Sequence, residues 1–171
     1  MNKFDYSLDY KSLNLRDRPD LYRVGKGEQG VLLVEPYKSE ILPFWRFKNP
    51  EIATESSNKI YQLFLAYLAE NDFVGADMAR KFLQMGYTRS RRYANHKSGK
   101  KYKANPQLAK SKAAEKEARQ EVLPLDIDPI KAKSAEIFKE KWQKAKANSK
   151  YQALLTQHKE KYKKTNGTAA N

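Results

Sequence analysis

The feature that most constrains this sequence is a run of 37 residues, from 78 to 114, that contains 11 Lys or Arg residues and no Asp or Glu. Such a run repels itself and gathers counterions, and their release becomes favourable when phosphates take their place. The run therefore predicts a polyanion as partner, most simply nucleic acid. A solvated basic tail is the alternative interpretation.

The rest of the chain carries far less of the net charge of +14. Residues 1–77 hold 10 Lys or Arg against 12 Asp or Glu, a net charge of −2, and residues 115–171 hold 13 against 8, a net charge of +5. With 40% apolar and 32% charged residues, the chain can form one core but is expected to leave an extended appendage outside it.

Several classes of site and of location are disfavoured by composition. The chain has no cysteine and only two histidines, so disulfides and a Cys/His zinc site are excluded. We assign no metal and no cofactor. The N-terminus has no apolar signal region, and no stretch approaches the roughly 18 apolar residues of a membrane span. We therefore expect a cytoplasmic protein without a membrane partner.

The first 48 residues have the composition of strands and turns. Tyr22–Val24 and Val31–Val34 are β-rich runs on either side of the sequence GKGEQG at 25–30, which predicts a hairpin. We expect an α+β fold in which a small N-terminal β-hairpin or sheet packs on two or three helices, with a basic helical C-terminal extension. The expected bounds are 1–105 for the α+β domain, 106–164 for the extension and 165–171 for a disordered tail.

Three capping signals predict helices within this plan. Asn49-Pro50 and Asp128-Pro129 each place a capping side chain before a proline at the first helical position, and Asp72 can cap a helix between them. Gly86 is expected to end that middle helix, because glycine accepts the positive φ of a C-terminal cap.

The C-terminal third is expected to be helical. Residues 106–121 predict an exposed helix with little apolar stripe. From Ile130 onward, apolar residues recur every three or four positions and predict one long helix or two short ones. This stripe needs a partner surface, either the chain's own domain or another protein. The residues expected to make that contact are Phe138, Trp142, Tyr151 and Leu155.

The candidate binding segment interleaves cations with tyrosines. Arginine supplies bidentate phosphate contacts, lysine supplies point charge, and a tyrosine ring can stack on an unpaired base. Thr88 is expected to cap a short helix whose N–H groups point at an anion. The predicted nucleic-acid-binding residues are Arg80, Tyr87, Arg89, Arg91, Arg92, Tyr93, His96, Lys97, Lys100, Lys101, Tyr102 and Lys103.

Recognition at this segment is expected to be dominated by phosphates and only weakly sequence-specific. A helix-turn-helix motif needs an apolar inner face on its second helix. Here Arg91, Arg92 and Asn95 leave few apolar residues on that face. The same contacts suit DNA and RNA. Tyr87 and Tyr93 are explained equally well as residues that close the core.

An enzyme acting on nucleic acid or a nucleotide is an alternative. The G-x-G-x-x-G pattern at 25–30 could cradle a phosphate, but a dinucleotide-binding fold needs a helix after it, so a hairpin turn explains the glycines better. Asp20 and Glu35 are candidate metal ligands of a nuclease, although the spacing from Glu35 to Lys38 is one residue too long. His96 could act as a general base. An assembly or adaptor protein that docks through the C-terminal stripe is the second alternative.

Four segments carry a resemblance to a known family. They are FDYSLD at 4–9, YRVGKGEQGVLLVEPYKSEIL at 22–42, WRFK at 45–48 and DFVGADMARKFLQMGYTRSRRYANHKSGKKY at 72–102. Together they resemble an uncharacterised family of bacteria, some bacteriophages and some algae that is described only as a domain of unknown function. The resemblance covers about the first 105 residues and implies no fold, activity or site.

Overall fold

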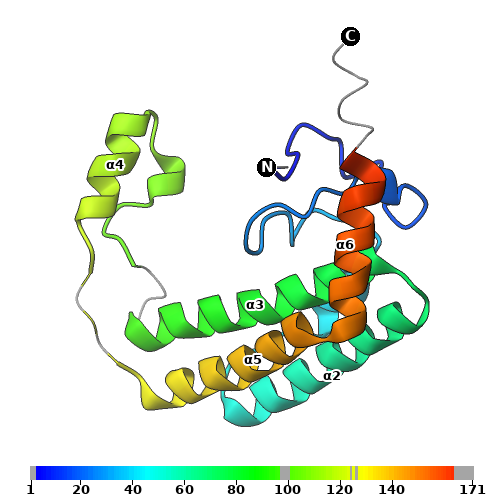
Figure 1. The fold of residues 1–171 in the computed structure, drawn as a ribbon. Helices are drawn as coiled ribbons and strands as arrows, with labels where there is room; N and C mark the ends of the chain where they lie inside the picture. Colours follow the sequence, from blue (N-terminus) through cyan, green and yellow to red (C-terminus); the bar gives the residue numbers. More distant parts are fainter. Residues whose placement is uncertain (1–2, 97–100, 124, 126, 164–171) are drawn as a thin grey trace.

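The computed structural model describes residues 3–96, 101–123, 125 and 127–163. These residues form an all-helical fold that contains no sheet, so the α+β class predicted from the sequence is wrong (Figure 1). In chain order the elements are η1 (Pro19–Leu21), α1 (Tyr37–Ile41), η2 (Leu42–Phe44), α2 (Pro50–Ala69), α3 (Phe73–Asn95), η3 (Pro106–Leu108), α4 (Lys112–Gln120), α5 (Pro129–Ala147) and α6 (Ser149–Lys163). The predicted tail at 165–171 lies outside the described residues.

The three predicted helix starts are confirmed. Each capping side chain accepts a hydrogen bond from the first turn of its helix: Asn49 from the Ile52 amide at 2.9 Å, Asp72 from Gly75 at 3.0 Å and Asp128 from Ile130 at 2.9 Å. These bonds satisfy amide groups that have no acceptor within the helix. Local chemistry therefore fixes where α2, α3 and α5 begin.

Helices α2, α3 and α5 pack against one another as a three-helix bundle, and α6 crosses one end of it beside the N-terminal loops (Figure 1). Phe64 of α2, Phe82 of α3 and Phe138 of α5 are fully buried between them. Burial of side chains of this size stabilises the fold by roughly 1.5–3 kcal/mol each. No helix in the described part of the chain is long and apolar enough to cross a membrane.

Gly86 lies inside α3 instead of at its end, so the predicted C-terminal cap is wrong. The helix continues to Asn95. A Cβ atom at position 86 would lie 2.2 Å from Cδ1 of Phe138, so glycine here permits the close approach of α3 and α5. The expected new helix at Thr88 is also absent, because Thr88 sits within α3 and donates a hydrogen bond to Glu28 at 3.0 Å.

Where a hairpin is predicted over 22–34, the chain forms no strand, and residues 26–33 form consecutive turns. Val31 and Val34 are buried, whereas Leu32 and Leu33 between them are 43% and 38% exposed. A strand would bury every second side chain, and a spacing of three fits a tight turn instead. The three glycines of this segment have φ values between +62° and +79°. They close turns with a backbone that other residues rarely adopt.

Residues 101–123 form an arm that stands away from the bundle (Figure 1). Two main-chain hydrogen bonds, of 3.0 and 2.8 Å, join residues 101–103 to residues 121–123 at the base of the arm. The exposed helix predicted over 106–121 forms only from Lys112 to Gln120. It starts there because the Ser111 side chain accepts a hydrogen bond from the Ala114 amide at 3.1 Å.

The C-terminal apolar stripe faces this chain's own core. Phe138 and Tyr151 are buried in it. Trp142 stacks on Tyr87 with ring centroids 5.8 Å apart, and Leu155 packs partly buried against the same cluster. Helices α5 and α6 therefore share one core with α2 and α3.

Candidate functional site

Arg89, Arg92 and Tyr93 share one exposed face of the last turns of α3. Their spacing of three and four residues places them side by side on a helix. Both arginine side chains are exposed, and Tyr93 is 39% exposed, with Phe47 against one side of its ring at 5.8 Å. In the described part of the chain, neither guanidinium group has a hydrogen bond or an ion pair. Both guanidinium groups can therefore bind an external anion.

The other predicted residues of α3 lie on different faces. Arg91 is half-buried, and the buried His96 follows the end of the helix. Tyr87 packs on Trp142, and the ammonium group of Lys139 lies 5.7 Å from the centre of the Tyr87 ring. Tyr87 and His96 thus contribute mainly to packing.

Arg80 is buried in a charged cluster around Asp77. The Arg80 guanidinium lies 2.7 Å from Oδ1 of Asp77, which also accepts a hydrogen bond from Tyr151 at 2.6 Å. Tyr22 donates to Oδ2 of the same carboxylate, and Lys81 lies 3.9 Å from it. This cluster ties α3 to α6 and to the N-terminal turns, and it removes Arg80 from the surface.

The glycine-rich turns are held by the same two cations. Lys81 Nζ donates hydrogen bonds to the carbonyl groups of Val24 and Gln29 at 2.7 and 2.6 Å. Arg80 donates to the Gly27 carbonyl at 2.8 Å. The conformation of the G-x-G-x-x-G segment is therefore explained by internal contacts, without a bound phosphate.

Opposing effects set the charge states in this cluster. Burial alone would raise the pKa of Asp77, but the charges of Arg80 and Lys81 and the hydrogen bonds from Tyr151 and Tyr22 lower it to about 2. Burial lowers the pKa of Lys81 to about 8, although the charge of Asp77 acts against this shift. Asp77 is therefore ionised near neutral pH. Loss of any partner would leave an uncompensated charge in the interior.

Glu28 places one carboxylate beside Arg89 and Arg92. Thr88 donates a hydrogen bond to it at 3.0 Å. Burial raises the pKa of Glu28, and the Thr88 hydrogen bond and the charges of Arg89 and Arg92 oppose that shift. No local pattern in the sequence links Glu28 to this face of α3, because its contact with Thr88 joins positions 60 residues apart. The negative charge of Glu28 acts on these two arginines and weakens the positive potential around them.

The base of the arm adds further exposed lysines to the positive charges at the end of α3. Lys101 and Lys103 are exposed, and Tyr102 is half-buried beneath Lys101, whose ammonium group lies 5.4 Å from the ring centre. Because His96 and Lys101 are five residues apart, their Cα atoms lie within about 18 Å of one another. We define the basic surface as Arg89, Arg92, Tyr93, Lys101 and Lys103. The predicted contacts Lys97 and Lys100 lie outside the described residues.

The candidate nuclease carboxylates have separate partners. Asp20 pairs with Arg18 at 2.8 Å, and Glu35 accepts a hydrogen bond from the Ser39 amide at 3.2 Å. In the described ranges, no three His, Asp or Glu side chains come together as a metal site would require.

Comparison with known proteins identifies the family of this chain. Neither the curated proteins nor the solved structures contain a significant match to this chain. Residues 5–161 match the profile of the family described as domain of unknown function DUF4385. The match extends past the segments that carry the resemblance in the sequence and includes α5 and most of α6. The chain therefore belongs to the DUF4385 family, as the resemblance of its N-terminal two thirds predicts.

Proposed function

We propose that this chain binds nucleic acid mainly through phosphate groups, at the basic surface on the C-terminal end of α3 and the base of the arm. The observation that carries this proposal is the exposure of Arg89 and Arg92 on one helical face, without an ion pair in the described part of the chain. Surface arginines in monomeric proteins commonly have a nearby carboxylate to pair with. Here Glu28, whose pKa the charges of Arg89 and Arg92 act to lower, is partly buried and accepts a hydrogen bond from Thr88.

The geometry suits contacts along a nucleic-acid backbone. Two guanidinium groups one helical turn apart can each form a bidentate contact with a phosphate. Lys101 and Lys103 add point charges at the base of the arm. These contacts carry no sequence information, so the binding is expected to be weakly sequence-specific.

Tyr93 provides an exposed ring on which an unpaired base can stack. One side of its ring packs on Phe47, and the ring remains 39% exposed beside the arginines. A base stacked on an aromatic ring typically contributes roughly 1–3 kcal/mol to binding. The position of Tyr93 therefore favours single-stranded over double-stranded nucleic acid.

The proposal is tested by fluorescence anisotropy with labelled single- and double-stranded DNA and RNA. The double variant Arg89→Ala/Arg92→Ala is compared with Lys11→Ala/Arg18→Ala, which removes the same charge from exposed positions in the part of the chain with a net charge of −2. We expect the first variant to weaken binding at least about tenfold, since each lost contact is charge-assisted. The second variant should bind like the wild type.

Two results would count against the proposal. One is the absence of binding by the wild-type chain to any of these nucleic acids near physiological salt. The other is equal weakening by the two double variants, because this would trace the affinity to net charge and not to the basic surface.

A further inference from the structure

The most exposed aliphatic side chains in the described part of the chain are concentrated between residues 108 and 130. Leu108 is 79% exposed, and four further side chains are between 53% and 68% exposed: Val122, Leu125, Ile127 and Ile130. Every other Leu, Ile or Val of the described ranges is at most 43% exposed. Single exposed apolar residues are ordinary, but a concentration of them marks an interaction surface.

The arm, which carries Leu108 and Val122, has little core of its own. Helix α4 is nine residues long, has no buried residue and packs mainly on η3 of the same arm. Among residues 101–123 only Pro106 is buried. A helix this short is marginal in water unless it packs on another surface. The arm stands away from the bundle (Figure 1), so its own chain does not supply that surface.

The tip of the arm is basic and held in a fixed turn. Leu108 ends η3, and Lys110 and Lys112 follow it in a stretch without Asp or Glu. The Asn105 side chain accepts a hydrogen bond from the Gln107 amide at 2.9 Å, and the Leu108 amide donates to the Asn105 carbonyl at 3.1 Å. We define the arm tip as Leu108, Lys110 and Lys112. It presents one apolar side chain next to two positive charges.

The segment that joins the arm to α5 has the opposite charge. Residues 121–130 contain three Asp or Glu and no Lys or Arg, in a chain with a net charge of +14. We define the acidic segment by its exposed side chains, which are Glu121, Val122, Leu125, Ile127, Asp128 and Ile130. Neither Glu121 nor the two lysines of the arm tip have an ion pair in the part of the chain that the structure describes.

We propose that two copies of this chain form a dimer in which the arm tip of each copy packs on the acidic segment of the other. Leu108 packs among the aliphatic side chains of the acidic segment, and Lys110 and Lys112 face its carboxylates. Each chain carries both surfaces, so a two-fold axis makes the same contact twice. The basic surface at Arg89 and Arg92 is not used, so loss of nucleic-acid binding would leave the dimer standing, and the reverse also holds.

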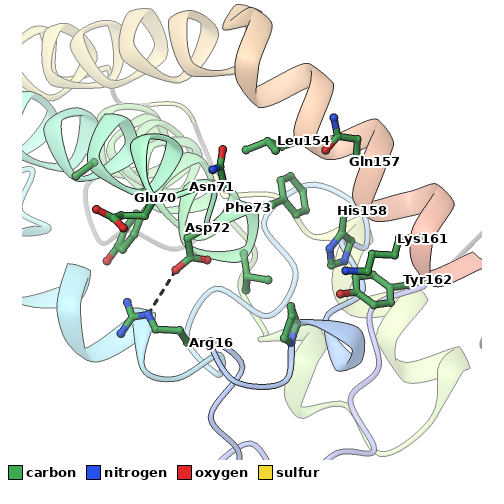
Figure 2. Close-up of a pocket in the computed structure, with 14 residues that line it drawn as sticks. Arg16, Glu70, Asn71, Asp72, Phe73, Leu154, Gln157, His158, Lys161 and Tyr162 are labelled. Carbon is green, nitrogen blue, oxygen red and sulfur yellow. Dashed lines mark hydrogen bonds and ion pairs between the residues drawn. The ribbon is translucent and has the colours of Figure 1, made fainter.

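The cleft of about 680 Å³ at the N-terminal end of α3 lies outside the proposed interface (Figure 2). None of its lining residues belongs to the arm tip or to the acidic segment. Arg16 on one side pairs with Glu40 at 2.7 Å, and Nε2 of His158 on the other side lies 2.8 Å from the Tyr22 carbonyl oxygen. Exposed residues beside this cleft, such as Lys161, therefore provide control positions for the dimer.

The first test measures the mass of the full wild-type chain by sedimentation equilibrium, from micromolar to submillimolar concentration. The salt concentration is about 0.15 M, which screens the repulsion between the two net positive charges beyond about 8 Å. We expect a reversible equilibrium between monomer and dimer. A mass that stays monomeric over the whole range overturns the proposal. A mass that keeps growing beyond the dimer also overturns it, because it indicates an open head-to-tail contact.

Two variants with one damaged surface each test which surfaces meet. Leu108→Asp damages the arm tip and Ile127→Asp damages the acidic segment, and both change exposed side chains, so circular dichroism should show the wild-type helix content. In a dimer of either variant both contacts are damaged, so we expect at least about tenfold weaker self-association. A mixture of the two variants can form one intact contact and should associate more tightly than either variant alone. Wild-type association of both variants, or a mixture as weak as each variant, contradicts the assignment.

Control variants separate the interface from general effects of charge. Leu65→Asp introduces the same charge at an exposed leucine of α2 and should leave the association unchanged. Lys110→Glu/Lys112→Glu should weaken it at least about tenfold. Lys159→Glu/Lys161→Glu makes the same change of charge at exposed positions of α6 and should not weaken it. Equal weakening by the two double variants would trace the association to net charge and overturn the proposal.

Discussion

Tyr151 of α6 donates a hydrogen bond of 2.6 Å to Asp77 of α3 inside the protein, across 74 positions of the sequence. The same carboxylate holds Arg80 and a hydrogen bond from Tyr22. The C-terminal helix is thus bonded to the charged cluster that also anchors the N-terminal turns. Helix α6 therefore carries lysines on its exposed face and makes this buried hydrogen bond from its opposite face.

This bond predicts the behaviour of Tyr151→Phe. The variant keeps the ring but leaves Asp77 without one donor, so we expect the free energy of unfolding to fall by about 2 kcal/mol. Tyr61→Phe is the matched control, because the Tyr61 hydroxyl has no hydrogen bond among the described residues, and it should change the stability by less than about 0.5 kcal/mol. Urea denaturation measures both. Equal stabilities of the two variants would show that the Tyr151 hydroxyl does not support the fold.

The contact between Gly86 and Phe138 predicts a destabilising alanine. In an exposed helix, Gly→Ala stabilises by about 1 kcal/mol. At position 86 the new Cβ would lie 2.2 Å from the Phe138 ring, and overpacking of this kind costs about 1–3 kcal/mol. We therefore expect Gly86→Ala to lower the melting temperature, measured by circular dichroism. Combination with Phe138→Leu should recover part of the loss, and an increase in melting temperature for Gly86→Ala alone would refute the close contact.

His158 predicts a loss of stability at mildly acidic pH. Burial lowers the pKa of His158, although its hydrogen bond with the Tyr22 carbonyl acts against the shift. The unfolded chain, with a histidine pKa near 6.5, then binds the proton more readily than the folded chain. Stability is therefore complete above about pH 6.5 and falls as the pH is lowered through the folded pKa.

Urea denaturation at several values between pH 8 and pH 5 measures this effect. His158→Gln should flatten the pH dependence relative to the wild type. A pH dependence that persists unchanged in this variant would assign the effect to another group.

Glu28 predicts a gain in affinity when its charge is removed. Its carboxylate lies close enough to Arg89 and Arg92 for their charges to oppose the rise in its pKa. Glu28→Gln should strengthen binding to single-stranded nucleic acid about threefold in anisotropy titrations, because the local potential becomes more positive. The same change should have little effect in the Arg89→Ala/Arg92→Ala background. An equal gain in both backgrounds would mean that Glu28 acts away from these arginines.

Local signals in the sequence were sufficient to predict where the long helices begin. A capping side chain acts on amides two or three residues away, so Asn49, Asp72 and Asp128 reveal their role without tertiary information. The turns at 26–33 depend instead on contacts with Lys81 and Arg80 that span more than 50 positions. No pattern within the segment carries those contacts, so its β-rich composition predicted a hairpin that does not form.

For the candidate site, too, local signals are readable from the sequence and contacts between distant positions are not. Helical spacing alone places Arg89, Arg92 and Tyr93 on one face. Arg80 has the same chemistry and lies on the same helix, but packing against Asp77 buries it. The distinction comes from the N-terminal turns, whose Gly27 carbonyl accepts a hydrogen bond from Arg80 at 2.8 Å, and from the buried Asp77 carboxylate that pairs with it. Charge in a sequence therefore identifies candidates, and tertiary packing decides which of them reach solvent.

The central claim is that Arg89 and Arg92 bind phosphates, and the salt dependence of binding tests it most directly. The logarithm of the binding constant for single-stranded nucleic acid is measured against the logarithm of salt concentration, for the wild type and for Arg89→Ala/Arg92→Ala. Loss of two phosphate contacts should reduce the steepness of this line by about 1.4 units. An unchanged slope in the double variant, or a wild-type affinity that does not depend on salt, would contradict the account.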